Sequence, residues 1–216
     1  MMSAAVQGGS ALSRERVALA ALVLVDSHGL DALSMRRLAA ELGVGTMTLY
    51  HYFPSKRELL DAVMDAAFAE QDPPRLEGSW REQIALLAGW ARGTIARHPD
   101  LAQIRAGAPI LRPEALRFSE DGLRVLEDAG FDTAEAVKAY RLLFTYTVGF
   151  SLLSSPAAEN QARDAARQAL AALPPEYYPR LSAAVEEAAE AMAGDVVFDY
   201  GLERLLDGLE LRLRPV

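Results

Sequence analysis

The feature of this sequence that most constrains its fold is a stretch at residues 34–58, where two short apolar-faced segments flank a glycine. Ser34 is a residue type that favours the N-cap of a helix. Gly43 stands where a helix commonly ends in a left-handed conformation. Between them, apolar residues recur with the spacing of one helical face: Met35, Leu38, Ala39 and Leu42. The pattern predicts a short amphipathic helix that stops at Gly43.

A second, very short helix follows this turn. Thr46 is a candidate N-cap, and Leu49 and Phe53 lie one turn apart on the side expected to face inward. Pro54 ends the helix, because the residue before a proline is disfavoured in the helical region. Two short helices joined by a glycine turn form the helix-turn-helix pattern, whose second helix lies in the DNA major groove. The stretch therefore predicts DNA binding.

Residues 55–75 predict a longer helix followed by a domain boundary. Ser55 and Glu58 form a capping box that opens a helix to about residue 70. The prolines of residues 71–75 break the chain. We therefore expect a disordered N-terminal tail (1–12), a helix-turn-helix domain (13–70), and a second domain (71–216) for ligand binding and dimerisation.

The remaining pattern is helical, and no alternating strand pattern is present, so the predicted fold is all-α. Ser13 caps a first helix to His28, which Gly29 ends, and this helix completes a three-helix head. The segment 173–179 should be irregular because of its prolines. The helices expected beyond the boundary share capping residues at their starts and Gly or Pro at their ends: 79–97, 113–129, 133–154, 180–193 and 195–212.

Two of these helices, 133–154 and 195–212, are apolar over most of their surface. The last one carries a heptad-like apolar seam: Phe198, Leu202, Leu205 and Leu209. Helices this apolar should be buried on more than one side. The favoured interpretation is a homodimer in which both helices pair with their symmetry mates in a four-helix interface. The alternative is a monomer core.

Charge and composition restrict the class of protein. The net charge is −8, yet residues 1–60 hold six Lys or Arg against five Asp or Glu, so the acidic excess lies beyond the head. The absence of cysteine excludes disulfides, thiol catalysis and thiolate metal sites. Neither a signal peptide nor a transmembrane stretch is expected, so the predicted location is the cytoplasm, with no membrane partner.

An enzyme and a helical protein-interaction module without DNA contact are the rival classes. The three histidines, His28, His51 and His98, are far apart in the sequence. The chain has no zinc-protease motif, no phosphate-binding glycine loop and no nucleophile-elbow motif. We therefore expect no catalytic residues, no metal and no cofactor.

The residues themselves resemble a known family. The run LSMRRLAAELGVGTMTLYHYFPSKRELLDAV is similar to the DNA-binding head of the tetracycline repressor (TetR) family. The segments HPDL (98–101), AYRLLFTYTVGFSLL (139–153) and YGLERLLDGLE (200–210) resemble the ligand-binding domain of its tetracycline-repressor-like branch. This resemblance implies an all-helical homodimer that binds a palindromic operator and is released by a small-molecule effector.

The resemblance also implies which residues contact DNA. The recognition helix is 46–52, and four of its residues should face base edges or adjacent phosphates: Thr46, Met47, Thr48 and His51. Arg36 could reach a base, since arginine to guanine is the commonest bidentate pairing. Three others should hold phosphates and so set the register without reading sequence: Ser34, Tyr50 and Lys56.

Candidate effector contacts lie in the second domain. A mostly apolar site with a few orienting polar groups is typical of small-molecule recognition. The aromatic and polar candidates are Trp90, His98, Arg105, Phe118, Tyr140, Phe144, Thr147 and Phe150. His98 has an alternative role, which is to cap carbonyl groups at a helix end.

Overall fold

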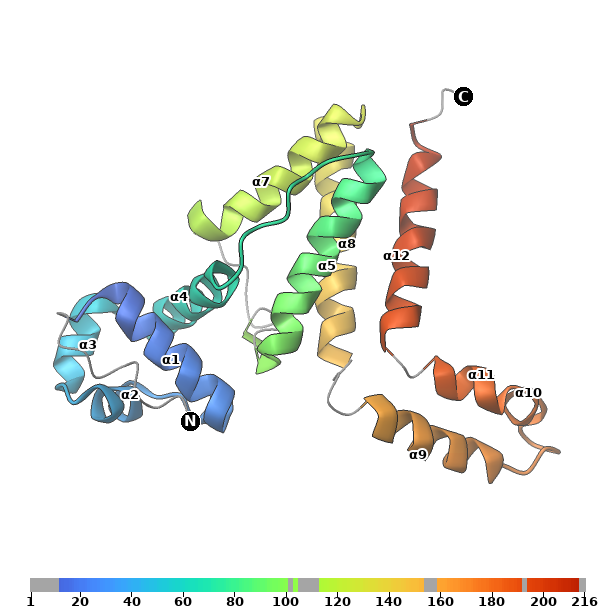
Figure 1. The fold of residues 1–216 in the computed structure, drawn as a ribbon, viewed down its shortest axis with the longest axis horizontal. Coiled ribbons are helices and arrows are strands. Elements are labelled where there is room, and N and C mark those ends of the chain that lie inside the picture. Colours follow the sequence, from blue (N-terminus) through green and yellow to red (C-terminus); the bar gives the residue numbers. More distant parts are fainter. Residues whose placement is uncertain (1–11, 101–102, 105–112, 154–158, 192–193, 214–216) are drawn as a thin grey trace. The chain divides into compact units, whose positions relative to one another are not determined.

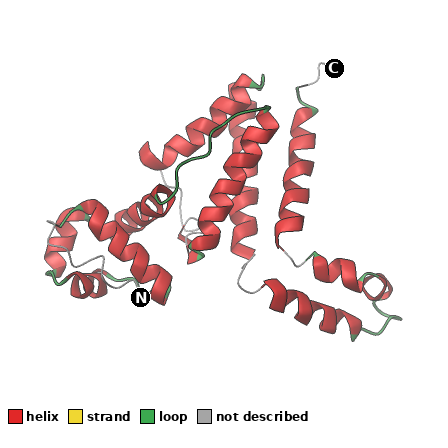
Figure 2. Cartoon of the chain, in the orientation of Figure 1, coloured by secondary structure: helices red, strands yellow, loops and turns green. Residues whose placement is uncertain are grey.

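The computed structural model describes residues 12–100, 103–104, 113–153, 159–191 and 194–213. Within these residues every regular element is a helix and none is a strand (Figure 2). The all-α prediction is therefore confirmed. The predicted tail, except Leu12, and the candidate effector residue Arg105 lie outside the described residues.

The chain divides into two compact units. The first contains Met1–Pro74 together with Arg97–Ser119, and the second contains Arg75–Ala96 together with Glu120–Val216. The segment after residue 96 thus groups with the helix-turn-helix region by its contacts. The assignment of 13–70 to DNA binding and of 71–216 to effector binding and dimerisation stays a prediction, because contact grouping does not report function.

The first two helices of the head begin as the sequence indicates. Helix α1 (Arg14–His28) starts where the Ser13 hydroxyl accepts a hydrogen bond from the Arg16 amide at 3.2 Å. Gly29 follows with φ +82°, a conformation that side chains disfavour. A short 3₁₀ turn η1 (Leu30–Ala32) then leads to α2 (Met35–Leu42), whose first turn is capped by Ser34.

The turn of the helix-turn-helix motif is confirmed, with one correction. Gly43 closes α2 in the left-handed region at φ +66°, and its amide bonds back to Ala39 and Ala40. Helix α3 (Thr46–Tyr52) begins after Gly45, which makes no side-chain cap, so Thr46 is the first helical residue rather than the N-cap. The cap was wrongly predicted because hydroxyl preference alone cannot fix the register of so short a helix.

Helix α4 (Lys56–Ala69) completes the head and packs against α1 (Figure 1). The Ser55 hydroxyl accepts from the Glu58 amide at 3.2 Å, as the predicted cap requires. Seven apolar residues of the three-helix head were expected to form its core. Of these, Leu24, Leu38, Leu49 and Phe53 are buried, whereas Leu30, Leu42 and Val44 are partly exposed.

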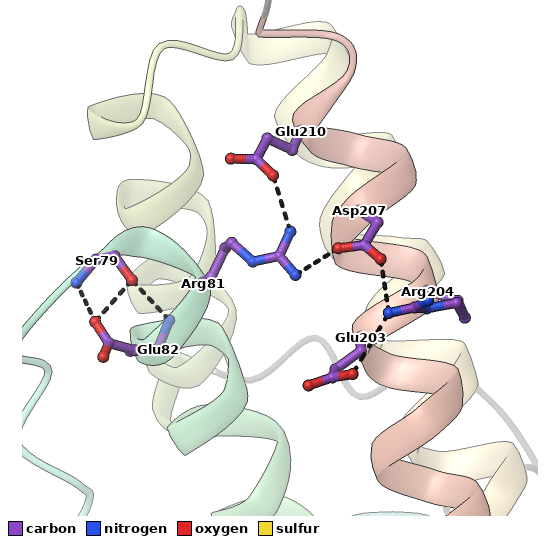
Figure 3. Close-up of polar contacts among 7 residues, drawn as sticks. All are labelled: Ser79, Arg81, Glu82, Glu203, Arg204, Asp207 and Glu210. Atoms are coloured by element: carbon purple, nitrogen blue, oxygen red, sulfur yellow. Dashed lines mark hydrogen bonds and ion pairs between the residues drawn. The ribbon is translucent and has the colours of Figure 1, made fainter.

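In the second unit the three longest helices begin close to the predicted residues: α5 (Trp80–Arg97), α8 (Thr133–Leu153) and α12 (Gly194–Glu210). Ser79 and Glu82 form a complete capping box at α5, with Ser79 N to Glu82 Oε2 at 2.7 Å (Figure 3). Arg81 ties α5 to α12 through Asp207 at 2.7 Å and Glu210 at 3.2 Å. Helix α7 (Pro113–Asp128) spans the change from the first unit to the second at residue 119.

The segment before α12 contains more helix than expected. The alanine-rich residues form α9 (Glu159–Ala171), a helix that the sequence pattern does not predict. The proline-rich segment after it is irregular up to Tyr178, as predicted, and Pro179 opens α10 (Pro179–Ala183). The single helix expected at 180–193 is two, α10 and α11 (Val185–Glu190), because the backbone breaks at Ala184.

The apolar seam of α12 is covered within the chain. Phe198, Leu202 and Leu209 are buried and Leu205 is partly so, in a unit where α12 packs against α8. The opposite side of α12 exposes Val196 and Tyr200. The seam therefore contributes to the core of the single chain.

Candidate nucleic-acid interface

Helix α3 is held to the head by a few defined contacts. The Leu49 and Phe53 side chains are fully buried. Arg14 of α1 donates to the Tyr52 carbonyl, and its guanidinium lies 4.3 Å from the centroid of the Phe53 ring. The Tyr52 hydroxyl donates to the Leu12 carbonyl at 2.9 Å. The start of α1 thus fixes the end of α3.

With its apolar side buried, α3 presents polar side chains to solvent. The Thr48 and His51 side chains are exposed, Tyr50 is 42% exposed and Met47 is 79% exposed. Thr46 is half-buried. Met47 is thus an exposed apolar side chain among the polar residues of α3.

The other three predicted DNA contacts flank α3 in the same unit. Arg36 lies exposed in the first turn of α2, and Lys56 is the exposed first residue of α4. The Ser34 hydroxyl already accepts from the Arg37 amide at 3.2 Å. The structure therefore brings all eight predicted residues into one unit, with hydroxyls, an imidazole and two cations around a single short helix.

A buried polar cluster lies in the same unit, away from those eight residues. His98 is 6% exposed, and its Nδ1 lies 2.9 Å from a carboxylate oxygen of Asp26. Its Nε2 lies 3.1 Å from Glu70 Oε2. Nearby, Asp100 accepts from the Leu30 amide at 3.1 Å. In this arrangement His98 contacts the head rather than the other predicted effector residues.

The predicted effector residues fall into two groups. Trp90, Tyr140, Phe144, Thr147 and Phe150 belong to the second unit. There the Tyr140 and Phe144 rings are 6.1 Å apart, and the buried Thr147 hydroxyl donates to the Leu143 carbonyl. Phe118 belongs to the first unit, where its ring lies 6.4 Å from that of Phe68.

Three residues that were not among the predicted effector contacts join this aromatic group: Arg92, Tyr146 and Phe198. Tyr146 stacks on Phe198 at 5.4 Å, and Phe150 meets Phe198 edge to face at 5.5 Å. The Arg92 guanidinium lies 4.7 Å from the Phe198 centroid. The only signal in the sequence was an arginine inside an apolar helix, which is too common a pattern to identify a site.

The Tyr146 hydroxyl is fixed between α8 and α12. It bonds to the Phe198 carbonyl at 2.8 Å, and a side chain in place of Gly201 would overlap it. Burial raises the pKa of the Tyr146 phenol above its ordinary value, with a smaller opposing effect from the positive charge of Arg92. The phenol therefore stays a neutral hydrogen-bond donor at physiological pH.

Metal sites and membrane-spanning helices are both absent from the described part of the chain. Among those residues, no three histidine or acidic side chains are grouped closely enough to hold a metal ion. Likewise, none of the described helices combines the length and apolarity needed to cross a bilayer.

Taken together, the fold and the exposed α3 define a helix-turn-helix DNA-binding protein with a second helical unit. Comparison with known families agrees. Residues 19–63 match the model described as "Bacterial regulatory proteins, tetR family", and residues 72–213 match "Tetracyclin repressor-like, C-terminal domain". The chain belongs to the TetR family of bacterial transcriptional regulators.

Individual relatives are similar to this chain over most of their length. The transcriptional repressor DrrR1 of Streptomyces coeruleorubidus is 36% identical over 93% of this chain and 78% of its own. The class A tetracycline repressor of transposon 1721 from Escherichia coli is 34% identical over 93% and 92%. The structure of Streptomyces coelicolor ActR in complex with actinorhodin has a TM-score of 0.84 at 31% identity, covering 95% of this chain and 100% of ActR.

These likenesses establish the general function. The protein is a ligand-responsive transcriptional repressor and not an enzyme. Members of its family bind operator DNA and small-molecule effectors and act as dimers.

Proposed function

We propose that this repressor binds a palindromic operator as a homodimer, reads it with α3, and leaves it when a flat polycyclic effector binds the second unit. The observation that carries the DNA-binding part is the division of α3 into a buried apolar side, with Leu49 and Phe53, and an exposed polar side. A helix of seven residues is too short to be stable alone, so the head exists to present it.

Within the operator, the exposed residues have different roles. Thr46, Met47, Thr48 and His51 contact base edges or the phosphates beside them, and Arg36 reaches a base. Lys56, Tyr50 and Ser34 hold phosphates and set the register. Support comes from their exposure around one helix and from the position of Lys56 at the capped start of α4.

The proposed dimer contact uses α8 and α12. Both helices have a buried side within the chain and an apolar side exposed to solvent. The exposed large apolar residues of the two helices are Val137, Leu142, Leu152, Leu153, Val196 and Tyr200. A closed dimer places the same surface of each protomer in one interface, and covering these side chains removes apolar area from water.

The proposed effector site is aromatic. Tyr140 pairs with Phe144 in the second unit, and Tyr146 and Phe150 pack on the buried ring of Phe198. Such rings suit a flat polycyclic compound, since offset and edge-to-face ring pairs are favourable. The relatives named for tetracycline and solved with actinorhodin support this class of ligand.

The proposed release of the operator depends on the distance between the two recognition helices of the dimer. Two recognition helices in one dimer enter successive major grooves only when they lie about one DNA turn, roughly 34 Å, apart. An effector that favours another separation lowers operator affinity without touching a base contact. By linkage, the effector then binds DNA-free protein more tightly than operator-bound protein. Equal effector affinity for both forms would exclude this mechanism.

The test of DNA binding uses a duplex from the region upstream of the protein's own gene. Fluorescence anisotropy at several salt concentrations should give specific binding with a steep salt slope, because several phosphates are neutralised. Lys56→Ala should lower the slope by about 0.9, the value for one phosphate contact. Arg124→Ala removes the same charge from an exposed residue of α7 and should leave the slope unchanged.

Tetracycline and actinorhodin are the probes for effector binding. Either compound should quench the protein's tryptophan fluorescence and weaken operator binding. The absence of any salt-dependent binding to the upstream duplex and to duplexes selected from a random library would favour the rival class, a helical protein-interaction module.

A further inference from the structure

The C-terminal ends of two head helices meet at one buried histidine. Asp26 lies in the last turn of α1, and Glu70 is the C-cap of α4. His98, from the segment that follows α5, contacts both carboxylates, at 2.9 Å through Nδ1 and 3.1 Å through Nε2. No role proposed above for DNA or effector binding uses this bridge.

The hydrogen bonds that the bridge can form depend on the number of protons on the His98 ring. A neutral imidazole has one N–H donor and one bare acceptor nitrogen, whereas an ionised carboxylate only accepts. If the His98 ring carried one proton, one nitrogen would face a carboxylate oxygen with no hydrogen between them. Both contacts are hydrogen bonds only when the ring is an imidazolium.

The two carboxylates of the bridge lie at the C-terminal ends of their helices. The C-terminus of a helix carries a partial negative charge, and here two such ends each bear a carboxylate. A cation between them offsets this repulsion. Two neighbouring charged groups have other partners: Asp100 accepts from the Leu30 amide, and the Arg97 guanidinium faces the side-chain amide group of Gln71.

We propose that His98 is a positioning residue for operator binding, which in its doubly protonated form holds the ends of α1 and α4 together and so links operator affinity to proton uptake. This inference rests on the proposed function, because it concerns how the head presents α3. Helices α1 and α4 form the largest helix–helix contact of the head. Their opposite ends carry Arg14, which holds α3, and Lys56.

The direction of the effect follows from the bridge. Histidine is the side chain that ordinarily changes charge between about pH 5 and 8. The bridge is complete when the proton is bound and loses one hydrogen bond when the proton leaves. Operator affinity therefore falls as the pH rises. Losing the net contribution of one typical hydrogen bond predicts about a three- to tenfold weaker affinity.

The experiment measures operator affinity of the full-length protein at about pH 6 and pH 8, at fixed ionic strength. The probe is a duplex that the wild-type protein selects from a random-sequence library. Wild type should bind it more weakly at the higher pH. The affinity of His98→Gln should change less between the two pH values, because this variant lacks the ring that takes up the proton. The other two histidines, His28 and His51, are unchanged in it. His28→Gln is the matched control and should keep the wild-type ratio between the two affinities.

Glu70→Gln tests whether the bridge needs the second proton on His98 or only a hydrogen bond between His98 and residue 70. An amide can donate a hydrogen bond to an unprotonated ring nitrogen, so this variant keeps the bridge when the ring is neutral. It should match or exceed wild-type affinity at the higher pH and show the reduced pH dependence of His98→Gln. Thermal unfolding at both pH values verifies that each variant is folded.

Two results overturn the inference. One is a His98→Gln variant with the same pH ratio as wild type. The other is a Glu70→Gln variant that loses affinity equally at both pH values, which would mean that only the carboxylate matters. Failure of the wild-type protein to select any duplex would instead overturn the proposed operator binding, and so the two failures are distinguishable.

Discussion

The two units of this protein use exposed side chains in different ways. In the first unit, the core side chains Leu49 and Phe53 are fully covered, and the exposed residues around α3 are mainly polar. In the second unit, apolar side chains such as Leu142 on α8 and Tyr200 on α12 are exposed although both helices also have a buried side. The first unit combines a buried apolar core with a mainly polar exposed surface around α3. The second unit also exposes apolar side chains on α8 and α12.

The polar ties of the two units differ as well. The head is joined by the buried His98 between two carboxylates. The second unit is joined by Arg81 to Asp207 and Glu210, whose side chains are 46% and 42% exposed. Exposed ion pairs contribute little to stability, so aromatic packing such as that of Phe198 holds the second unit together.

The largest expected effect tests whether the head is a self-contained core. Phe53→Ala should destabilise the protein by about 3–5 kcal/mol, as expected for removing a buried aromatic ring. Chemical unfolding measures this loss. Met47→Ala, a change on the exposed side of the same helix, should leave the unfolding midpoint unchanged. A small loss for Phe53→Ala would mean that the head core is not closed.

The next effect tests the exposed apolar surface of α8. A double change, Leu142→Glu with Leu152→Glu, should convert the dimer to monomers in sedimentation experiments. Operator affinity should fall by about 100-fold or more, because two linked half-site contacts become independent. Val23→Glu, which changes an apolar residue of α1 that is 57% exposed, should leave the dimer intact. A dimer that survives the double change would place the interface elsewhere.

A smaller effect sharpens how the head holds α3. Arg14→Ala removes the contacts to the Tyr52 carbonyl and the Phe53 ring. Because Arg14 is exposed, we expect only about a fivefold loss of operator affinity. The salt slope should not change, since Arg14 contacts the protein and not phosphate. A slope reduced by about 0.9 would make Arg14 a phosphate contact instead.

The smallest effect concerns the start of α5. Hydrogen bonds from Ser79 lower the pKa of the Glu82 carboxyl. A carboxyl whose pKa is lowered by folding stabilises the folded state above its ordinary pKa, and this contribution disappears as the pH falls through the folded value. Glu82→Gln should therefore flatten the stability profile slightly below about pH 4.5. An unchanged acid profile would show that the cap is not formed in solution.

Local structure was predictable where a single residue type determines it. Ser13, Ser34 and Ser55 each accept the expected amide, and Gly43 takes the left-handed conformation. The α9 segment escaped prediction because its alanines give no strong apolar period. Thr46 was wrongly predicted as a cap because Gly45 takes that position.

The functional residues were predictable to different degrees. Those around α3 follow from local spacing, since a helix of known register fixes which side chains face outward. The effector candidates depend on which distant segments meet. The sequence offered His98 as an effector contact, whereas the structure joins it to Asp26 and Glu70. Arg92, Tyr146 and Phe198 come together only through the packing of three helices.

The helix-turn-helix stretch at 34–58, its serine caps and the all-α class could be predicted from the residues alone, because these depend on contacts within a few residues. That the seam of Phe198, Leu202 and Leu209 faces the chain's own core became visible only in the folded structure. Heptad spacing shows that one side of a helix is apolar, but it cannot say which partner covers that side. The partner depends on the whole chain, and here it leaves the opposite side of α12 exposed.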